Sequence, residues 1–95
     1  MDKLVVPADI RGLIRTMHPS VKKKVKSSLK MILSGPHSGK ALAGELAGLG
    51  SLRVSSFRII YKIEDPEQIE LVAMGPRERI YEETFRALRK EAGKQ

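Results

Sequence analysis

The amino-acid sequence predicts a single α+β domain, spanning residues 1–95, in which helices lie on one face of a mostly antiparallel sheet. Three observations support this fold class. The segment from Ser51 to Tyr81 has the pattern of three consecutive strands followed by the start of a helix. Two segments with helical periodicity precede it. All five prolines fall at the boundaries of these expected elements, so the segmentation is consistent along the chain.

The composition limits the classes of function. A chain of 95 residues has the size of one domain, and a hydrophobic content of 41% excludes wholesale disorder. The absence of cysteine excludes disulfides and thiolate metal sites, and it fits a reducing cytoplasm. No signal peptide or bilayer-length apolar run is present, so we expect a cytoplasmic protein with no membrane partner. The net charge of +7 predicts a polyanionic partner, either nucleic acid or an acidic protein segment.

The first third of the chain predicts a short strand and a helical hairpin. The apolar run at residues 4–6 indicates a brief strand before Pro7. Apolar residues with spacing i, i+3, i+4, i+7 predict an amphipathic helix over residues 8–17. A second helix follows over residues 20–34, either capped by Ser20 or starting at the preceding proline. Its polar face is strongly basic and contains Lys22, Lys23, Lys26 and Lys30. Such a face is commonly solvated, and alternatively it contacts RNA phosphates.

The glycine-rich segment from Gly35 to Gly50 predicts a loop, with a helical turn over Lys40–Leu46. We expect this loop to form the edge or lid of a site, because functional residues concentrate on such connections.

The second half of the chain predicts a three-stranded antiparallel meander and a final helix. Alternating apolar and polar residues indicate strands over residues 51–55, 57–64 and 68–74. A turn with proline at its second position connects the last two strands. Helical spacing of apolar residues predicts the final helix over residues 80–91.

The first hairpin of the meander determines which side chains share a face. A two-residue loop at Ser55-Ser56 places Val54 opposite Phe57 and Arg53 opposite Arg58. One face then carries the core residues Leu52, Val54, Phe57, Ile59, Tyr61 and Ile63. The other carries two directly opposed arginines, an arrangement that is destabilising on its own. A bound anion would justify it, and the alternative is a pair of solvated arginines on an open sheet face.

Three motifs occur in order along the chain: Leu46-x-Gly48-x-Gly50-Ser51-Leu52-Arg53-Val54, then Phe57-Arg58-Ile59-Ile60-Tyr61, then Gly75-Pro76-Arg77-Glu78-Arg79 with Tyr81. Together with the order of elements, they resemble the RelE/ParE superfamily of type II toxins over roughly residues 4–90. The resemblance implies the RelE-like fold and a cognate antitoxin that wraps and neutralises the chain in a hetero-oligomer.

The resemblance also implies one of two activities. RelE-like members are ribosome-dependent mRNA interferases that cleave by attack of the 2′-OH on the adjacent phosphate, whereas ParE-like members poison DNA gyrase without a nuclease site. Our leading hypothesis is an mRNA interferase, a metal-independent endoribonuclease with the ribosome and mRNA as partners. The alternatives are a gyrase poison, or a catalytically inactive homologue that acts with its antitoxin as a repressor.

Site residues follow from the same resemblance. Arg58 and Arg77 match the catalytic arginines, Arg53 matches a frequent basic position, and Tyr81 matches a tyrosine that stacks on a base near the scissile phosphate. Arginine suits this chemistry because it is planar, bidentate and charged, and the phosphorane carries extra negative charge. Tyr81 also shares helical spacing with Phe85, so the alternative is a core residue. The lysines of the second helix would contact ribosomal RNA.

The sequence departs from the family pattern at the proton acceptor. Leu49 and Ser51 stand where nuclease members have lysines, and Pro76 replaces a histidine or lysine. No histidine or carboxylate is obviously placed as a substitute. His37 and Lys40 lie on the glycine-rich loop and could move into the site, although His37 is more simply an ordinary surface residue. No His/Asp/Glu cluster has the spacing of metal ligands, so we expect no metal or cofactor.

Overall fold

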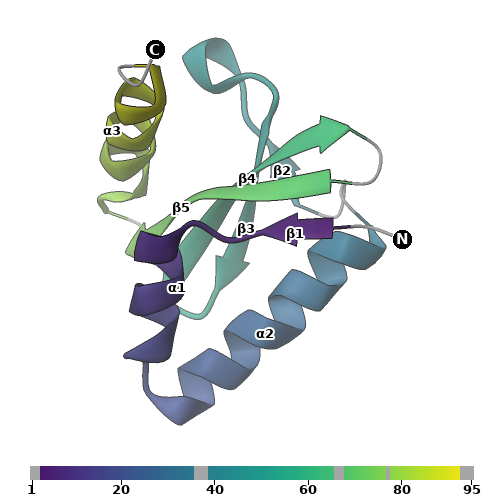
Figure 1. The fold of residues 1–95 in the computed structure, drawn as a ribbon, viewed down its shortest axis with the longest axis vertical. Helices are drawn as coiled ribbons and strands as arrows, with labels where there is room; N and C mark the ends of the chain where they lie inside the picture. The colour runs from purple at the N-terminus through teal and green to yellow at the C-terminus, as the bar shows by residue number, and fades with distance from the viewer. Residues whose placement is uncertain (1–2, 36–38, 66–67, 77, 93–95) are drawn as a thin grey trace.

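The computed structural model describes residues 3–35, 39–65, 68–76 and 78–92, and it confirms the predicted α+β fold with helices and a mixed sheet (Figure 1). The elements in chain order are β1 (Lys3–Val5), α1 (Ala8–Arg15), α2 (Pro19–Ser34), β2 (Lys40–Ala41), a 3₁₀ turn (Gly44–Leu46), β3 (Leu49–Val54), β4 (Phe57–Asp65), β5 (Gln68–Pro76) and α3 (Ile80–Ala92). None of the helices in this part of the chain is long and apolar enough to span a bilayer.

The strands of the described residues form one five-stranded sheet in the order β1-β5-β4-β3-β2. The predicted meander of β3, β4 and β5 is antiparallel throughout. The N-terminal strand β1 joins it in parallel, with Lys3 opposite Gln68, so the first strand of the chain pairs with the last.

The segment Lys40–Leu46 does not form the predicted helical turn over its whole length. Its first two residues form the edge strand β2, which pairs with β3 so that Lys40 lies opposite Ser51. The helical part is confined to the 3₁₀ turn, because Gly44 has a left-handed φ of +66° that a continuous right-handed helix cannot accommodate. The Leu42 N–H donates to the Leu49 carbonyl at 2.9 Å and closes this second hairpin.

Helix α2 starts at Pro19, so the second of its two predicted starts is confirmed and Ser20 is not the cap. Pro19 occupies the first turn, where its missing N–H is not needed, and His18 is the capping residue. The Ser20 N–H donates to His18 Nδ1 at 3.2 Å, and Ser20 Oγ lies 2.9 Å from the same nitrogen. His18 is therefore an exposed capping residue at the helix break.

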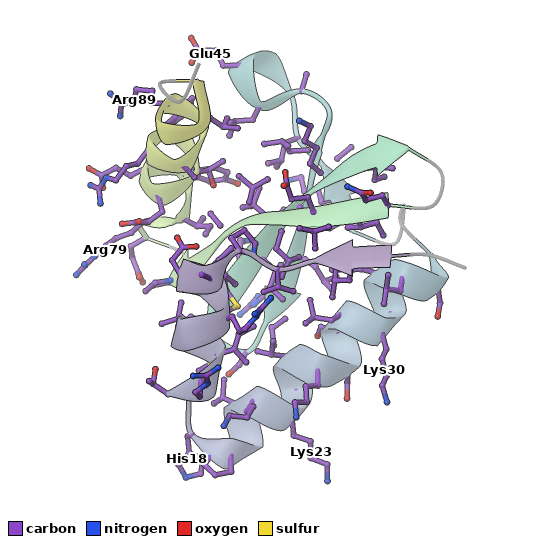
Figure 2. All side chains as sticks on the ribbon, in the orientation of Figure 1. His18, Lys23, Lys30, Glu45, Arg79 and Arg89 are labelled. Atoms are coloured by element: carbon purple, nitrogen blue, oxygen red, sulfur yellow. The ribbon has the colours of Figure 1, made fainter. Side chains whose placement is uncertain are left out.

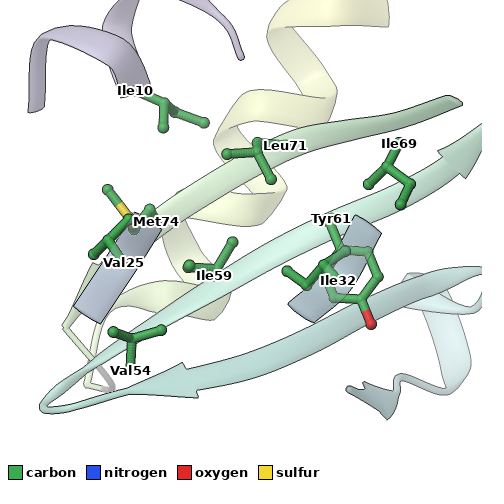
Figure 3. Packing of buried hydrophobic residues seen from close by; sticks show 9 residues of the cluster. All are labelled: Ile10, Val25, Ile32, Val54, Ile59, Tyr61, Ile69, Leu71 and Met74. Carbon is green, nitrogen blue, oxygen red and sulfur yellow. The ribbon is translucent and has the colours of Figure 1, made fainter. Parts of the chain in front are cut away.

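Helices cover both faces of the sheet, which corrects the prediction that they would gather on one. On one face α1 and α2 pack onto β3, β4 and β5, and buried residues of these helices and strands form one cluster (Figure 3): Ile10, Val25, Ile32, Val54, Ile59, Tyr61, Ile69, Leu71 and Met74. On the other face α3 covers Ile60 and Ala73, with Leu46 and Leu49 beside them. The prediction failed because Ile60, which alternates with core residues, is itself fully buried and needs its own cover.

The predicted core face of the hairpin is largely confirmed. Val54, Ile59 and Tyr61 are buried in the first cluster, and Leu52 and Ile63 pack against it. Phe57, the remaining residue predicted for that face, lies beside the hairpin loop, is half-buried and belongs to neither core cluster.

Tyr61 is held between two glycines at the β2 end of this core. The Gly39 N–H donates to its hydroxyl at 3.2 Å, and a Cβ on Gly50 would lie only 2.5 Å from its ring. Burial raises the pKa of the Tyr61 hydroxyl above its ordinary value of 10.0, and the hydrogen bond from Gly39 opposes part of that rise. Glycine is therefore required at both positions by close approach.

Candidate functional site

The β3–β4 hairpin places its two arginines side by side, with the predicted register. Arg53 lies opposite Arg58, next to the pair that closes the two-residue loop. The first loop residue, Ser55, has a φ of 58°. Two-residue hairpin loops need a positive φ there to match the twist of the strands, and a residue other than glycine adopts it at a cost. The chain thus retains a strained residue beside the arginine pair.

The two arginines differ in how firmly they are held. Arg58 is half-buried, and its Nη1 donates to Ser51 Oγ at 3.0 Å. Ser51 is itself only 2% exposed, so this bond fixes the guanidinium against the sheet. Arg53 is exposed, and its Nε donates to the Ser55 carbonyl at 3.3 Å. The pair therefore combines one anchored cation with one that lies along the loop.

A hollow of about 200 Å³ opens beside this pair. Its lining residues are Arg53, Ser55, Ser56, Phe57, Arg58 and Glu78. The sheet register explains the presence of Glu78, because Phe57 lies opposite Pro76 and Arg58 opposite Gly75. Residues that follow Pro76 are thereby brought next to the hairpin. The described lining of the hollow contains two cations able to bind a phosphate and one carboxylate able to accept a proton.

Glu78 was missed by the sequence reasoning, which found no carboxylate in place of the absent lysines. The signal that would have found it is the pairing of the third strand with the second, since that register places the Gly75-Pro76 end beside Arg58. A pattern along one strand does not contain this information.

Tyr81 is 46% exposed, so the alternative interpretation of a core residue is wrong. The neighbouring Ile80 and Thr84 take the buried positions of α3 instead, and the Thr84 hydroxyl donates to the Ile80 carbonyl at 2.7 Å. Tyr81 does not line the hollow of the arginine pair. Its ring is accessible near the start of α3.

The two positions where nuclease relatives have lysines face inward in this chain. Leu49 is 7% exposed and belongs to the core beneath α3, while Ser51 is the buried partner of Arg58. Lys40 approaches from the neighbouring strand, because β2 places it opposite Ser51 and directly opposed residues point to the same face. Its side chain is exposed. The structure thus supplies a lysine to this face from β2.

The other predicted site residues lie on α2 or outside the described residues. Lys23, Lys26 and Lys30 are exposed and Lys22 is half-buried, and Figure 2 shows Lys23 and Lys30 directed away from the sheet. Arg77 and His37 lie outside the described residues. Within those residues no group of three or more His, Cys, Asp or Glu side chains is arranged to hold a metal.

Solved structures with the same fold come from toxin–antitoxin systems. The RelBE2 toxin–antitoxin complex of Mycobacterium tuberculosis contains a chain 23% identical to this one, with a TM-score of 0.68, and the match covers 80% of this chain and 98% of that one. The Escherichia coli RelBE complex matches with 20% identity and a TM-score of 0.68, over 83% and 100% of the two chains. The archaeal RelE–RelB complex of Pyrococcus horikoshii matches with 15% identity and a TM-score of 0.65, over 82% and 97%.

Among curated proteins, no match to the chain was found. Residues 6–81 match the model of the ParE toxin family, described as the ParE toxin of type II toxin–antitoxin systems. This match spans most of the chain, and the solved structures have the fold that the sequence motifs predict. The chain therefore belongs to the ParE toxin family, within the RelE/ParE superfamily of type II toxins.

Proposed function

We propose that this toxin is a ribosome-dependent mRNA interferase whose phosphate site is the hollow beside Arg53 and Arg58. The observation that carries the proposal is the opposed arginine pair beside a carboxylate. Attack of a 2′-OH on the adjacent phosphate creates a phosphorane with extra negative charge, which two guanidinium groups stabilise. Like charges opposed on a sheet destabilise the fold, so a bound phosphate gives this pair a role that folding does not.

Each residue has a distinct role in this proposal. Arg58, anchored by Ser51, binds a non-bridging oxygen of the scissile phosphate, and Arg53 binds from the loop side. Glu78 accepts the 2′-OH proton as a general base, and the bond from phosphorus to the 5′ oxygen then breaks to leave a 2′,3′-cyclic phosphate and a 5′ oxygen that takes a proton from water. Tyr81 stacks on a base, since its ring is exposed. Arg77 would add a third cation, as the resemblance to the superfamily implies.

The partner in this proposal is a cognate antitoxin, and the toxin and antitoxin form a hetero-oligomer. The solved relatives in complexes with RelB proteins support it, because their toxin chains share this fold. The net charge of +7 favours an antitoxin segment rich in acidic residues.

The test is primer extension on a reporter mRNA in a reconstituted translation system. The key variant is Arg58→Gln, which removes the charge but keeps a neutral donor for Ser51. We expect cleavage to fall roughly 10²–10³-fold, the usual cost of losing one transition-state donor. Arg89→Gln, an exposed site on α3, is the matched control and should cleave like the wild type. A folded Arg58→Gln protein with near wild-type cleavage would remove this arginine from the site.

A second candidate function is gyrase poisoning, which the match to the ParE family model favours. A folded wild-type protein that produces no ribosome-dependent cuts would reject the nuclease. Inhibition of DNA supercoiling by the same preparation would then identify the toxin as a gyrase poison, and its absence would leave the inactive, repressor-forming homologue.

A further inference from the structure

A second hollow lies between α2 and the β3 end of the arginine hairpin. It has a volume of about 610 Å³ and is wider than the hollow of the candidate site. The residues that give it its chemistry are Lys23, Lys24, Ser27, Ser28, Arg53 and Ser55. We call it the α2 groove.

The described lining of the α2 groove carries positive charges that no acidic side chain of that lining neutralises. Among the described residues it combines three cations with hydroxyl groups, and none of its described lining residues is a carboxylate. The sequence of α2 contains no acidic residue at all, so no i,i+4 partner neutralises its lysines. Across the described part of the chain, Lys23, Lys24 and Arg53 enter no ion pair. Ammonium, guanidinium and serine hydroxyl groups are the donors that proteins direct at phosphate oxygens.

The α2 groove is continuous with the candidate site. Arg53 and Ser55 line both hollows, so the two meet at the hairpin loop. A nucleic-acid strand with one phosphate at Arg58 therefore has a lined path past Arg53 towards Lys23 and Lys24. Proteins that hold single strands use such a basic groove to follow the backbone.

We propose that the α2 groove binds the phosphate backbone of the single-stranded RNA whose cleavage takes place beside Arg58. This inference rests on the proposed function, since the scissile phosphate defines where the strand enters. It assigns Lys24 and the α2 serines to substrate binding and separates them from Lys26 and Lys30, which do not line the groove. An acidic antitoxin segment is the competing occupant, and the test below distinguishes it.

The test measures binding of a fluorescently labelled single-stranded RNA oligonucleotide by anisotropy across a range of salt concentrations. Lys23→Gln/Lys24→Gln should weaken binding tenfold or more and reduce the salt slope by about 1.4, which is about 0.7 for each of two phosphate contacts. Arg15→Gln/Arg89→Gln removes the same charge from exposed sites on α1 and α3 and should change binding less than threefold.

A third variant, Ser27→Leu, separates the groove from a diffuse positive field. Ser27 is exposed on α2, so the helix tolerates a larger side chain, and the net charge is unchanged. We expect binding to weaken several-fold because the isobutyl group fills part of the groove and cannot stack on a base. Wild-type affinity in Ser27→Leu, equal losses in the two charge variants, or no RNA binding by the wild type would each overturn the proposal.

The same variants distinguish RNA from an antitoxin and from a failure of the proposed function. Loss of antitoxin binding by Lys23→Gln/Lys24→Gln with RNA affinity retained would assign the groove to the acidic protein and overturn the proposal. Groove-dependent RNA binding without any cleavage would reject the nuclease and keep the groove. Cleavage by the groove variants with a wild-type KM would reject the groove and keep the nuclease.

Discussion

The apolar core covers the two faces of the sheet to different extents. Beneath α1 and α2 the described strands carry a continuous core from Val54 to Ile69, whereas beneath α3 the core around Ile60 and Ile80 occupies only part of the face. Towards the hairpin, the second face carries Ser51 and Arg58 in place of apolar residues. Because successive residues of a strand point to opposite faces, the same strands build a core on one side and a polar site on the other.

The largest expected effect is the loss of stability when a buried residue of β4 is truncated. Two adjacent residues of this strand allow the test on each face of the sheet. Ile59 and Ile60 are both fully buried, on opposite faces. Truncation of a buried isoleucine to alanine costs about 2–5 kcal/mol of unfolding free energy. We expect Ile59→Ala to lie near the upper end and Ile60→Ala near the lower end, since the smaller cluster relaxes more easily. Urea unfolding measures both, and a larger loss for Ile60→Ala would reverse the comparison.

The next effect concerns the exposed Tyr81 of α3, the helix that covers the second face. Replacement of Tyr81 by alanine should reduce mRNA cleavage about 5–150-fold, because stacking of a base on an aromatic ring contributes about 1–3 kcal/mol. Its exposed ring makes little contribution to the core, so the melting temperature should hardly change. Tyr81→Phe keeps the ring and should cleave like the wild type. Equal activity of the alanine and phenylalanine variants would exclude stacking at this position.

A smaller effect concerns the salt dependence of ribosome binding. It involves exposed lysines of α2, a helix that packs over the first face. Lys26 and Lys30 are exposed there. If they contact ribosomal RNA, Lys26→Gln/Lys30→Gln should flatten the salt dependence of ribosome binding by roughly one to two units of slope. Binding titrations at several salt concentrations measure it. An unchanged slope would make these lysines a solvated helix face.

The smallest effect is a dependence of stability on alkaline pH, which arises in the closed core. The folded state holds the pKa of Tyr61 above that of the unfolded chain. Its contribution to stability is therefore fully present below about pH 10 and is lost as the pH rises through the folded pKa. Tyr61→Phe removes the ionising group, so its unfolding free energy should fall less steeply above pH 10. Parallel curves for the two proteins would contradict this linkage.

The sequence was sufficient for the features that depend on local pattern. Alternation across Ser55-Ser56 gave the register of Arg53 and Arg58, and helical spacing located α1, α2 and α3 within two residues of their observed bounds. The superfamily resemblance, and with it the fold, followed from the ordered motifs.

The features it missed depend on tertiary contact. Ile60 lies at a position of β4 where the alternation predicts a solvent-facing residue. Only the packing of α3 over it explains why it is buried. Helical spacing left a core position open as the alternative for Tyr81, and only the rotation of α3, which turns Ile80 and Thr84 inward, excludes it. β2 is two residues long, too short to produce a pattern. Glu78 reaches the arginines only through the pairing of two strands.

The parallel pairing of β1 with β5 has a consequence for synthesis. β1 leaves the ribosome before the other described strands, yet β5, its partner in the described sheet, is encoded after β2, β3 and β4. Chains emerge at about 5–20 residues per second, and local hairpins form far faster than that. The arginine hairpin can thus form before β1 has a partner strand. β1 pairs with β5 only after most of the chain has been translated. The order of translation makes the N-terminal edge one of the last parts of the toxin to become native.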